Sequence, residues 1–261
     1  MPFALPRARR PRLGVPSDPF RVTTADGVAL VGARIGVARP AVVVCHGFGG
    51  WHGKARYARL AEWLSEWLSV YVFDFRGHGR SGGLSSFGGL EINDVDAVVT
   101  RARRDDRDPV ATLGASMGGI AVIRHAALLG GVDAVVAVST PARWDGHRSA
   151  AVRRMAWLTG TARGRRLGRV AGIRLASEWV RPEAPGEVVG KIAPVPLMLV
   201  HGRDDHFFDE EEAWRLYRAA SEPTSLWLAD RFGHAEDGFS RPFAERVARF
   251  LYRTWWLEWP G

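Results

Sequence analysis

One serine of this chain has a spacing that is typical of a nucleophile. Ser116 is the central residue of GASMG (114–118), within the stretch TLGASMGGI. Gly-x-Ser-x-Gly is typical of a sharp turn from a strand into a helix, which exposes a serine hydroxyl to substrate. A chain with 30 glycines also produces this spacing by chance, so the five residues alone leave a structural turn serine open. A nucleophilic serine further requires a base that takes its proton.

The base can be sought among eight histidines, and imidazole is the side chain suited to this task near neutral pH. His234 follows the last predicted strand in a short loop that contains a glycine. Asp204 and Asp205 follow the apolar run LMLVHG and could orient an imidazole. The other positions favour structural roles. His125 lies in a predicted helix, His52 and His147 lie in loops without a partner, and His46, His78 and His201 each precede a glycine at a strand end.

Hydrophobic periodicity predicts the framework that would bring these residues together. The alternation in residues 20–36 around Asp26-Gly27 predicts a β-hairpin. Continuous apolar runs such as AVVVCHG (41–47) predict buried strands, and they alternate with helical patterns such as residues 54–68. This alternation predicts right-handed crossovers and a mostly parallel sheet with helices on both faces. In such sheets ligands bind beyond the carboxyl ends of the strands. Polar clusters follow four predicted strands, at residues 46–50, 74–82, 114–118 and 201–206.

Residues 141–190 interrupt this alternation, which indicates an inserted helical cap. Four glycines at intervals of four residues, Gly160 to Gly172, resemble the small-residue pattern of closely packed helices. Each glycine costs about 1 kcal/mol of helix stability relative to alanine, so we expect a mobile cap. The expected organisation is a basic, Pro-rich arm at residues 1–19, an α/β core at 20–140 and 191–261, and the cap at 141–190.

The order and placement of these clusters resemble those of α/β-hydrolase-fold serine hydrolases, over about residues 20–256. The resemblance implies an α/β fold whose mostly parallel central sheet has helices on both faces and an inserted helical cap. It implies Ser116 as the nucleophile and His234 as the general base. Family members commonly carry His-Gly-x-x-Asp after the corresponding strand, which implies Asp205 as the acid, with Asp204 pointing away.

The resemblance also implies an oxyanion hole made of two backbone amides. The amide of Met117, at the start of the helix after Ser116, is one donor. The amide of Phe48, in HGFGG, is the other by resemblance. The stretch DFRGHGRSG (74–82) is similar to a family loop whose role is structural, which leaves Asp74 and His78 outside the catalytic set.

We therefore expect a serine hydrolase that cleaves carboxylic esters of small molecules through an acyl-enzyme. Met155, Trp157 and Trp179 are expected to line an apolar acyl pocket, with a core of the insertion itself as the alternative. A thioesterase, acyltransferase or carbon–carbon bond hydrolase would use the same residues, and a non-catalytic binding protein is the alternative of a different class. The sequence contains neither a metal-ligand cluster nor Gly-x-Gly-x-x-Gly, so we expect no metal and no cofactor.

Charge and composition bear on partners and location. The net charge of +8 is concentrated in residues 1–21, with five arginines against one aspartate, and in residues 141–190, with ten arginines against four acidic residues. A weak contact of the arm and cap with an anionic surface would follow, whereas we expect no nucleic-acid partner. No apolar stretch approaches the roughly 20 residues of a transmembrane helix, and no apolar segment follows the N-terminal arginines as in a secretory signal. Cys45 is the single cysteine, and together these features predict a cytoplasmic protein.

Overall fold

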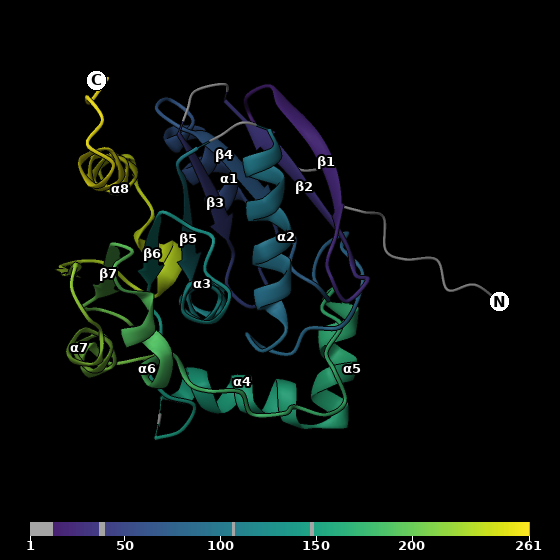
Figure 1. The fold of residues 1–261 in the computed structure, drawn as a ribbon. Coiled ribbons are helices and arrows are strands. Elements are labelled where there is room, and N and C mark those ends of the chain that lie inside the picture. Colours follow the sequence, from purple (N-terminus) through teal and green to yellow (C-terminus); the bar gives the residue numbers. More distant parts are fainter. Residues whose placement is uncertain (1–12, 37–39, 106–107, 147–148, 261) are drawn as a thin grey trace.

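The apolar runs that the sequence marks as buried strands form the centre of one sheet in the computed structural model, which describes residues 13–36, 40–105, 108–146 and 149–260 (Figure 1). The strands are β1 (Ser17–Thr23), β2 (Ala29–Ile35), β3 (Ala41–Cys45), β4 (Ser69–Phe73), β5 (Val110–Ala115), β6 (Ala134–Val138), β7 (Leu197–Gly202) and β8 (Thr224–Ala229). Within the described residues they form an eight-stranded sheet in the order β1-β2-β4-β3-β5-β6-β7-β8. Strands β3 to β8 are parallel to one another. The predicted mostly parallel sheet is confirmed.

The first two strands form the predicted hairpin, and they pair antiparallel with each other and with β4. Gly27 has a φ of +84° at the turn, a conformation that glycine adopts without a steric penalty. Its N–H donates to the carbonyl of Thr24 at 2.9 Å. Because β1 begins at Ser17, the last residues of the predicted arm belong to the sheet. The rest of that arm, up to residue 12, lies outside the described residues.

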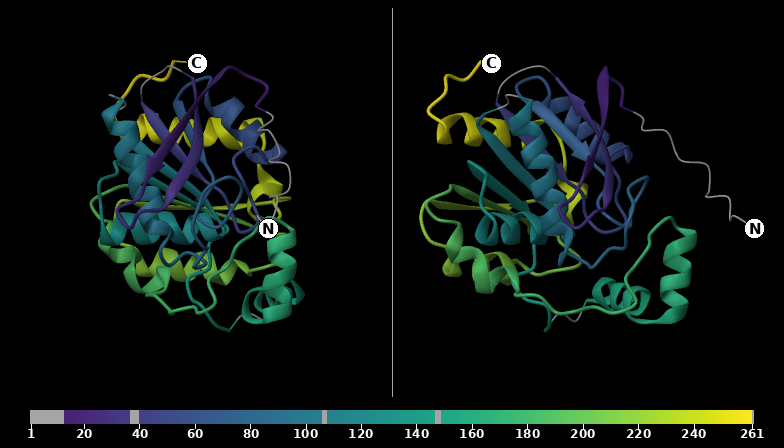
Figure 2. Two further views of the ribbon diagram at one scale, coloured as in Figure 1. Left: turned by 90° about the vertical axis from the view of Figure 1, so that its right-hand side faces the viewer. Right: turned by 45° about the vertical axis from the view of Figure 1, so that its right-hand side comes forward.

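Helices cover both faces of the sheet, as predicted (Figures 1 and 2). The helices are α1 (Ala55–Leu64), α2 (Glu91–Arg104), α3 (Met117–Leu128), α4 (Ala150–Gly160), α5 (Ala162–Val170), α6 (Pro185–Val188), α7 (Glu210–Ala219) and α8 (Arg241–Thr254), with 3₁₀ turns η1 (Val189–Ile192) and η2 (Ala235–Gly238). Helices α1 and α8 pack on one face, and α2, α3 and α7 pack on the other. Among the described residues, no helix combines the length and apolar character that crossing a bilayer requires.

Alternate residues of each central strand enter two separate cores, because successive side chains of a strand point to opposite faces. Val42 and Val44 of β3 pack in the core that contains α1 and α8. Val43 and Cys45 of the same strand pack in the core that contains α2 and α3. Complete burial raises the pKa of the Cys45 thiol well above its ordinary value, so this cysteine is an inert packing residue.

The segment between β6 and β7 contains α4, α5, α6 and η1. The predicted glycine series does not lie in one helix: Gly160 ends α4, and Gly172 follows α5. Gly164 lies where α5 approaches α4, and a Cβ atom there would be 2.4 Å from the carbonyl oxygen of Trp157. The glycine therefore permits the close contact of these two helices. Figures 1 and 2 show α4 and α5 at the outside of the molecule.

Candidate active site

Ser116 lies at the turn where β5 ends and α3 begins. Its backbone has φ 53° and ψ −115°, a sparsely populated conformation that costs on the order of 1–3 kcal/mol for a residue other than glycine. The Ser116 N–H donates to the carbonyl of Val138 at 2.9 Å, which attaches the turn to the neighbouring strand β6. Strain of this kind concentrates at functional sites, where the surrounding structure maintains it.

The two glycines that flank Ser116 allow three segments of backbone to meet at this turn. A Cβ atom on Gly114 would lie 2.2 Å from the carbonyl oxygen of Gly118. A Cβ atom on Gly118 would lie 2.2 Å from the carbonyl oxygen of Cys45 in β3. Both contacts are with backbone, which has no alternative rotamer, so the spacing Gly-x-Ser-x-Gly is a packing requirement of the turn itself.

His234 and Asp205 form a hydrogen-bonded pair, although they lie on loops after different strands. The His234 Nδ1 atom is 2.8 Å from Asp205 Oδ2 and 3.0 Å from Asp205 Oδ1. The Asp205 side chain is completely buried, and the His234 side chain is 10% exposed. A carboxylate at Nδ1 stabilises the tautomer that carries its proton there, which leaves Nε2 as a proton acceptor.

Asp205 is held as a carboxylate by its hydrogen bonds. Burial alone would raise its pKa, but the bond to His234 and the backbone amides of Phe207 and Phe208 keep the pKa below its ordinary value. These two amides donate to Oδ1 at 2.8 and 3.1 Å. Asp204, in contrast, has an exposed side chain, in agreement with the expectation that it points away.

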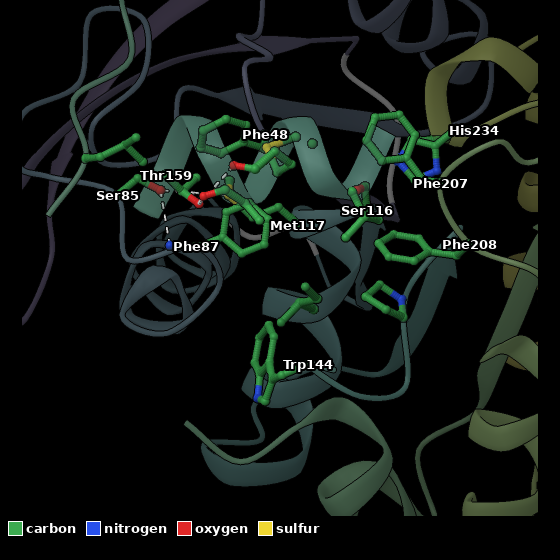
Figure 3. A pocket seen from close by; sticks show the side chains of 18 of the residues that line it. Phe48, Ser85, Phe87, Ser116, Met117, Trp144, Thr159, Phe207, Phe208 and His234 are labelled. Atoms are coloured by element: carbon green, nitrogen blue, oxygen red, sulfur yellow. Dashed lines mark hydrogen bonds between the residues drawn. The ribbon is translucent and has the colours of Figure 1, made fainter. Parts of the chain in front are cut away.

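Aromatic rings surround the His234 imidazole, a feature that the sequence did not lead us to expect. The Phe207 ring lies 4.2 Å from the imidazole, centroid to centroid, with an angle of 30° between the planes. The Phe208 ring meets the imidazole edge-on at 5.6 Å. Figure 3 shows these rings beside His234 and Ser116. The only signal in the sequence is that both phenylalanines lie within three residues of Asp205, in DHFF (205–208).

The glycine-rich loop after β3 is attached to the protein on both sides of Phe48. The Gly47 N–H donates to Tyr57 Oη at 2.8 Å, and the Gly49 N–H donates to His78 Nε2 at 3.2 Å. Among the described residues, neither the Phe48 N–H nor the Met117 N–H has a hydrogen-bond partner. Both residues line the same cavity as Ser116. Unpaired backbone amides at such a place are the donors that an oxyanion requires.

His46 supports this loop as a neutral imidazole. Its Nε2 atom accepts from the Phe75 N–H at 3.0 Å, and its Nδ1 atom is 2.8 Å from the carbonyl oxygen of Gly47. Burial lowers the pKa of His46 to about 3, because no solvent is present to stabilise the charged form. The structural role expected for this histidine follows from these contacts.

Asp74 is buried beneath the same loop, where it organises backbone. Its Oδ1 atom lies 2.7 Å from His52 Nδ1 and accepts from the His52 N–H at 2.8 Å. Its Oδ2 atom accepts from the Arg80 N–H at 2.8 Å. The pair of Asp74 and His52 was not anticipated, because nothing in the sequence relates two residues in different loops.

Ser116 and His234 line one cavity of about 540 Å³ (Figure 3). Loops after the six parallel strands β3 to β8 line it, and α4 forms part of the opposite wall. Most of its wall is apolar, and its aromatic members are Phe48, Tyr57, Phe87, Trp144, Trp179, Phe207 and Phe208. Among the hydrogen bonds of the described residues, none joins Ser116 Oγ to His234. Catalytic contacts of this type commonly tighten when substrate binds.

The insertion supplies two of the three side chains expected in the pocket. Met155 of α4 and Trp179 line the cavity. Trp157 is a correction, because it does not line the cavity and is 48% exposed on the outer side of α4. Met155 and Trp157 are two positions apart, and residues at that spacing do not share a face of a helix.

Two further serines line the cavity but are bonded elsewhere. Ser85 Oγ donates to Glu91 Oε1 at 2.7 Å, and Ser86 Oγ donates to Glu91 Oε2 at 2.6 Å. In the part of the chain that the structure describes, no group of three or more His, Cys, Asp or Glu side chains could hold a metal ion.

Known proteins resemble this chain in sequence. Residues 36–168 match the family described as Serine aminopeptidase, S33. The chain is 27% identical over 252 residues to the uncharacterised protein YfhR of Escherichia coli O157:H7, which covers 90% of this chain and 80% of that protein. It is 36% identical over 113 residues to a monoacylglycerol lipase of Mycolicibacterium smegmatis, across 40% of this chain and 38% of the lipase.

The fold is shared with the esterase Pf2001 of Pyrococcus furiosus. The TM-score is 0.74 at 24% sequence identity, and the alignment covers 96% of this chain and 97% of the esterase. The family match extends over just over half of this chain and includes β3 to β6, the glycine-rich loop and the Ser116 turn. The chain therefore belongs to the Serine aminopeptidase, S33 family of α/β-hydrolase-fold serine hydrolases.

Proposed function

We propose that this protein hydrolyses carboxylic esters of small molecules through an acyl-enzyme on Ser116, with His234 as the base and Asp205 as the acid. One observation carries the proposal: Ser116, at a strained turn, shares a cavity with His234, whose Nδ1 atom lies 2.8 Å from the buried carboxylate of Asp205. A nucleophile, a base and a group that orients the base are the three parts that acyl transfer requires.

In the first half of the reaction, Ser116 Oγ attacks the carbonyl carbon of the ester while His234 Nε2 takes the hydroxyl proton. The electron pair of the carbonyl bond moves to oxygen, and the amides of Phe48 and Met117 donate to the resulting oxyanion. Loss of one such donor typically costs about 3 kcal/mol of transition-state stabilisation. The bond to the alcohol then breaks, and the leaving alkoxide takes the proton from His234.

In the second half, water attacks the acyl carbon and gives a proton to His234 Nε2. The tetrahedral intermediate expels Ser116 Oγ, which recovers that proton, and the carboxylic acid leaves. Asp205 stays ionised throughout and stabilises the imidazolium that forms twice in the cycle. The lowered pKa of its carboxyl group supports this role.

The cavity favours an apolar acyl ester over a substrate with a free α-amino group. An aminopeptidase needs a carboxylate inside the cavity for the substrate ammonium group. Of the three described acidic residues that line the cavity, Glu178 is exposed to solvent and the other two are paired. Glu236 forms an ion pair with Lys54, and Asp237 lies 3.6 Å from Arg56. The aromatic wall instead supports burial of an acyl chain or aryl group, with a gain of about 25 cal/mol for each Å² removed from water.

Labelling with a fluorophosphonate tests the nucleophile directly, since this probe phosphonylates an activated serine without reporting on substrate preference. Wild-type protein should be labelled, and Ser116→Ala should not. Ser85→Ala and Ser86→Ala are matched controls, because these hydroxyls line the same cavity but are bonded to Glu91. If wild-type protein is not labelled, or if Ser116→Ala is labelled equally, the serine hydrolase mechanism is wrong.

A substrate series then tests the ester assignment. Aryl esters of increasing acyl length should be cleaved with a maximum in kcat/KM, while aminoacyl anilides should not be cleaved. Thioesters of the same acyl groups provide the comparison with a thioesterase. Preferential cleavage of thioesters or anilides by protein that is labelled on Ser116 would keep the mechanism and refute the ester specificity.

A further inference from the structure

Helix α4 has two faces of different character. The inner face lines the cavity through Val152, Met155, Ala156 and Thr159, whose spacing follows one side of a helix. The opposite face exposes Arg153, Arg154 and Trp157 to solvent. The arrangement is amphipathic, but the outer face includes a tryptophan that is half exposed among the described residues.

Helix α5 is turned so that its large apolar residues face outward. Its buried positions are Gly164 and Gly168, which offer no side chain to the interior. Leu167 is 55% exposed and Val170 is 78% exposed. Arg163 lies at helical spacing from both and belongs to the same outer face. A surface helix usually turns its large apolar residues toward the protein core. Here they face outward, so this face lacks a partner within the described residues.

The outer face of both helices is also strongly cationic. Residues 149–172 contain six arginines and no aspartate or glutamate. Within the described part of the chain, no ion pair involves Arg163, Arg166 or Arg169. We name the exposed residues of the two helices the α4–α5 outer face: Arg153, Arg154, Trp157, Arg163, Arg166, Leu167, Arg169 and Val170.

We propose that the α4–α5 outer face docks this protein on an anionic lipid surface. Arginines interspersed with tryptophan, leucine and valine match an interface whose headgroups are negative and whose acyl region lies immediately beneath. Trp157, Leu167 and Val170 would enter that apolar region. A nucleic acid would contact the arginines through its phosphates and would leave these exposed apolar residues without a contact.

Docking would place the cavity against the membrane. Helix α4 lies between its own outer face and the cavity that contains Ser116, so the wall of the cavity is a single helix thick at this point. The segment that follows α5 is attached to the protein body. The Arg174 N–H donates to the carbonyl of Gly77 at 2.7 Å, and the Arg174 carbonyl accepts from the Ser85 N–H at 2.8 Å. The surface is therefore anchored at one end to the loop that lines the cavity.

Cosedimentation with vesicles tests this proposal, which does not depend on the hydrolase mechanism because full-length Ser116→Ala protein can be used. Vesicles of phosphatidylcholine and phosphatidylglycerol in equal proportion should bind the protein, and vesicles of phosphatidylcholine alone should bind it weakly. Each arginine near an anionic surface contributes roughly fivefold to partitioning, so Arg163→Gln/Arg166→Gln/Arg169→Gln should reduce binding on the order of 100-fold. High salt should weaken the binding of the parent protein.

The controls separate this surface from general positive charge. Arg59→Gln/Arg104→Gln/Arg253→Gln removes the same charge from exposed positions on α1, α2 and α8 and should bind within a few-fold of the parent. Replacement of the three α5 arginines by lysine should retain binding, because the charge is kept. Leu167→Ser/Val170→Ser should bind less than the parent while keeping the charge, and circular dichroism checks that each variant is folded.

Two outcomes would overturn the proposal. Equal losses in the α5 triple variant and the control triple variant would show that net charge, and not this face, governs binding. Binding to duplex DNA that exceeds binding to phosphatidylglycerol vesicles, and that Leu167→Ser/Val170→Ser leaves unchanged, would identify a nucleic-acid surface instead.

Discussion

Replacement of Asp205 by asparagine provides the sharpest test of the proposed triad. Asparagine has nearly the same shape, and the surrounding hydrogen bonds determine how its amide lies. Phe207 and Phe208 both donate N–H groups to Oδ1, so the amide oxygen must occupy that place. The NH₂ group then takes the place of Oδ2, 2.8 Å from His234 Nδ1.

This orientation reverses the hydrogen bond to the imidazole. An NH₂ group donates to Nδ1, which moves the ring proton to Nε2 and removes the acceptor that Ser116 requires. A wrong tautomer of this kind lowers kcat about 10⁴-fold, or about 5 kcal/mol of transition-state stabilisation. The loss should appear mainly in kcat, with KM for a soluble ester little changed, because Asp205 does not line the cavity.

Steady-state hydrolysis of a soluble aryl ester and the rate of fluorophosphonate labelling both measure this effect. Asp204→Asn is the matched control: the side chain is exposed, and its loss should change kcat about twofold at most, as for an ordinary surface substitution. If Asp205→Asn retains a tenth of the activity or more, or if Asp204→Asn is the inactive variant, our assignment of the acid is refuted.

Three further predictions concern the support of the site. Phe207→Leu should lower kcat/KM about threefold to tenfold by loss of the tilted ring that lies 4.2 Å from the imidazole. The loss should exceed that of Phe208→Leu, whose ring meets the imidazole edge-on at 5.6 Å, and an equal loss would argue against a positioning role for the closer ring. Gly118→Val should prevent folding or lower the thermal midpoint sharply, since its Cβ would overlap the Cys45 carbonyl. Gly160→Ala has open space around the added Cβ, so its thermal midpoint should be unchanged or higher. Thermal unfolding followed by circular dichroism distinguishes the two. His46 has a folded-state pKa of about 3 against 6.5 when exposed, so the unfolded chain binds the proton first as the pH falls. The free energy of unfolding should therefore decrease between these pH values, by up to about 1.4 kcal/mol per pH unit. Urea titrations that show no such slope, or the same slope in His46→Gln, would contradict this.

Local patterns were sufficient for the sheet and for the turn at Ser116. The central strands are continuous apolar runs in the sequence because both of their faces are buried. The side chains of β3, for example, enter separate cores on the two sides of the sheet. Gly114 and Gly118 were readable because their requirement is steric and lies within five residues of sequence. Such features depend on near neighbours in the chain, which is why the sequence reports them.

Hydrophobic periodicity could not predict contacts between loops. The bond between His52 and Asp74 and the ring contact of Phe207 with His234 join residues from different loops, and no spacing along the chain encodes them. The error at Trp157 has a related origin. A helix that is exposed on one side and faces a cavity on the other can carry aromatic residues on either face, and composition does not reveal which face is inside.

The sequence by itself determined the parallel α/β framework, the position of Ser116 at a strand-to-helix turn, and the basic character of the insertion, because each of these follows from local period, glycine placement or charge. The choice of Asp205 over Asp204 came from a family resemblance, and only the tertiary structure placed the Asp205 carboxylate 2.8 Å from His234 Nδ1. Only the tertiary structure, too, decided that the arginines and Trp157 of α4 face away from the cavity. Those outcomes depend on how loops after separate strands converge and on how one helix is rotated about its axis, and both are settled by packing between distant parts of the chain.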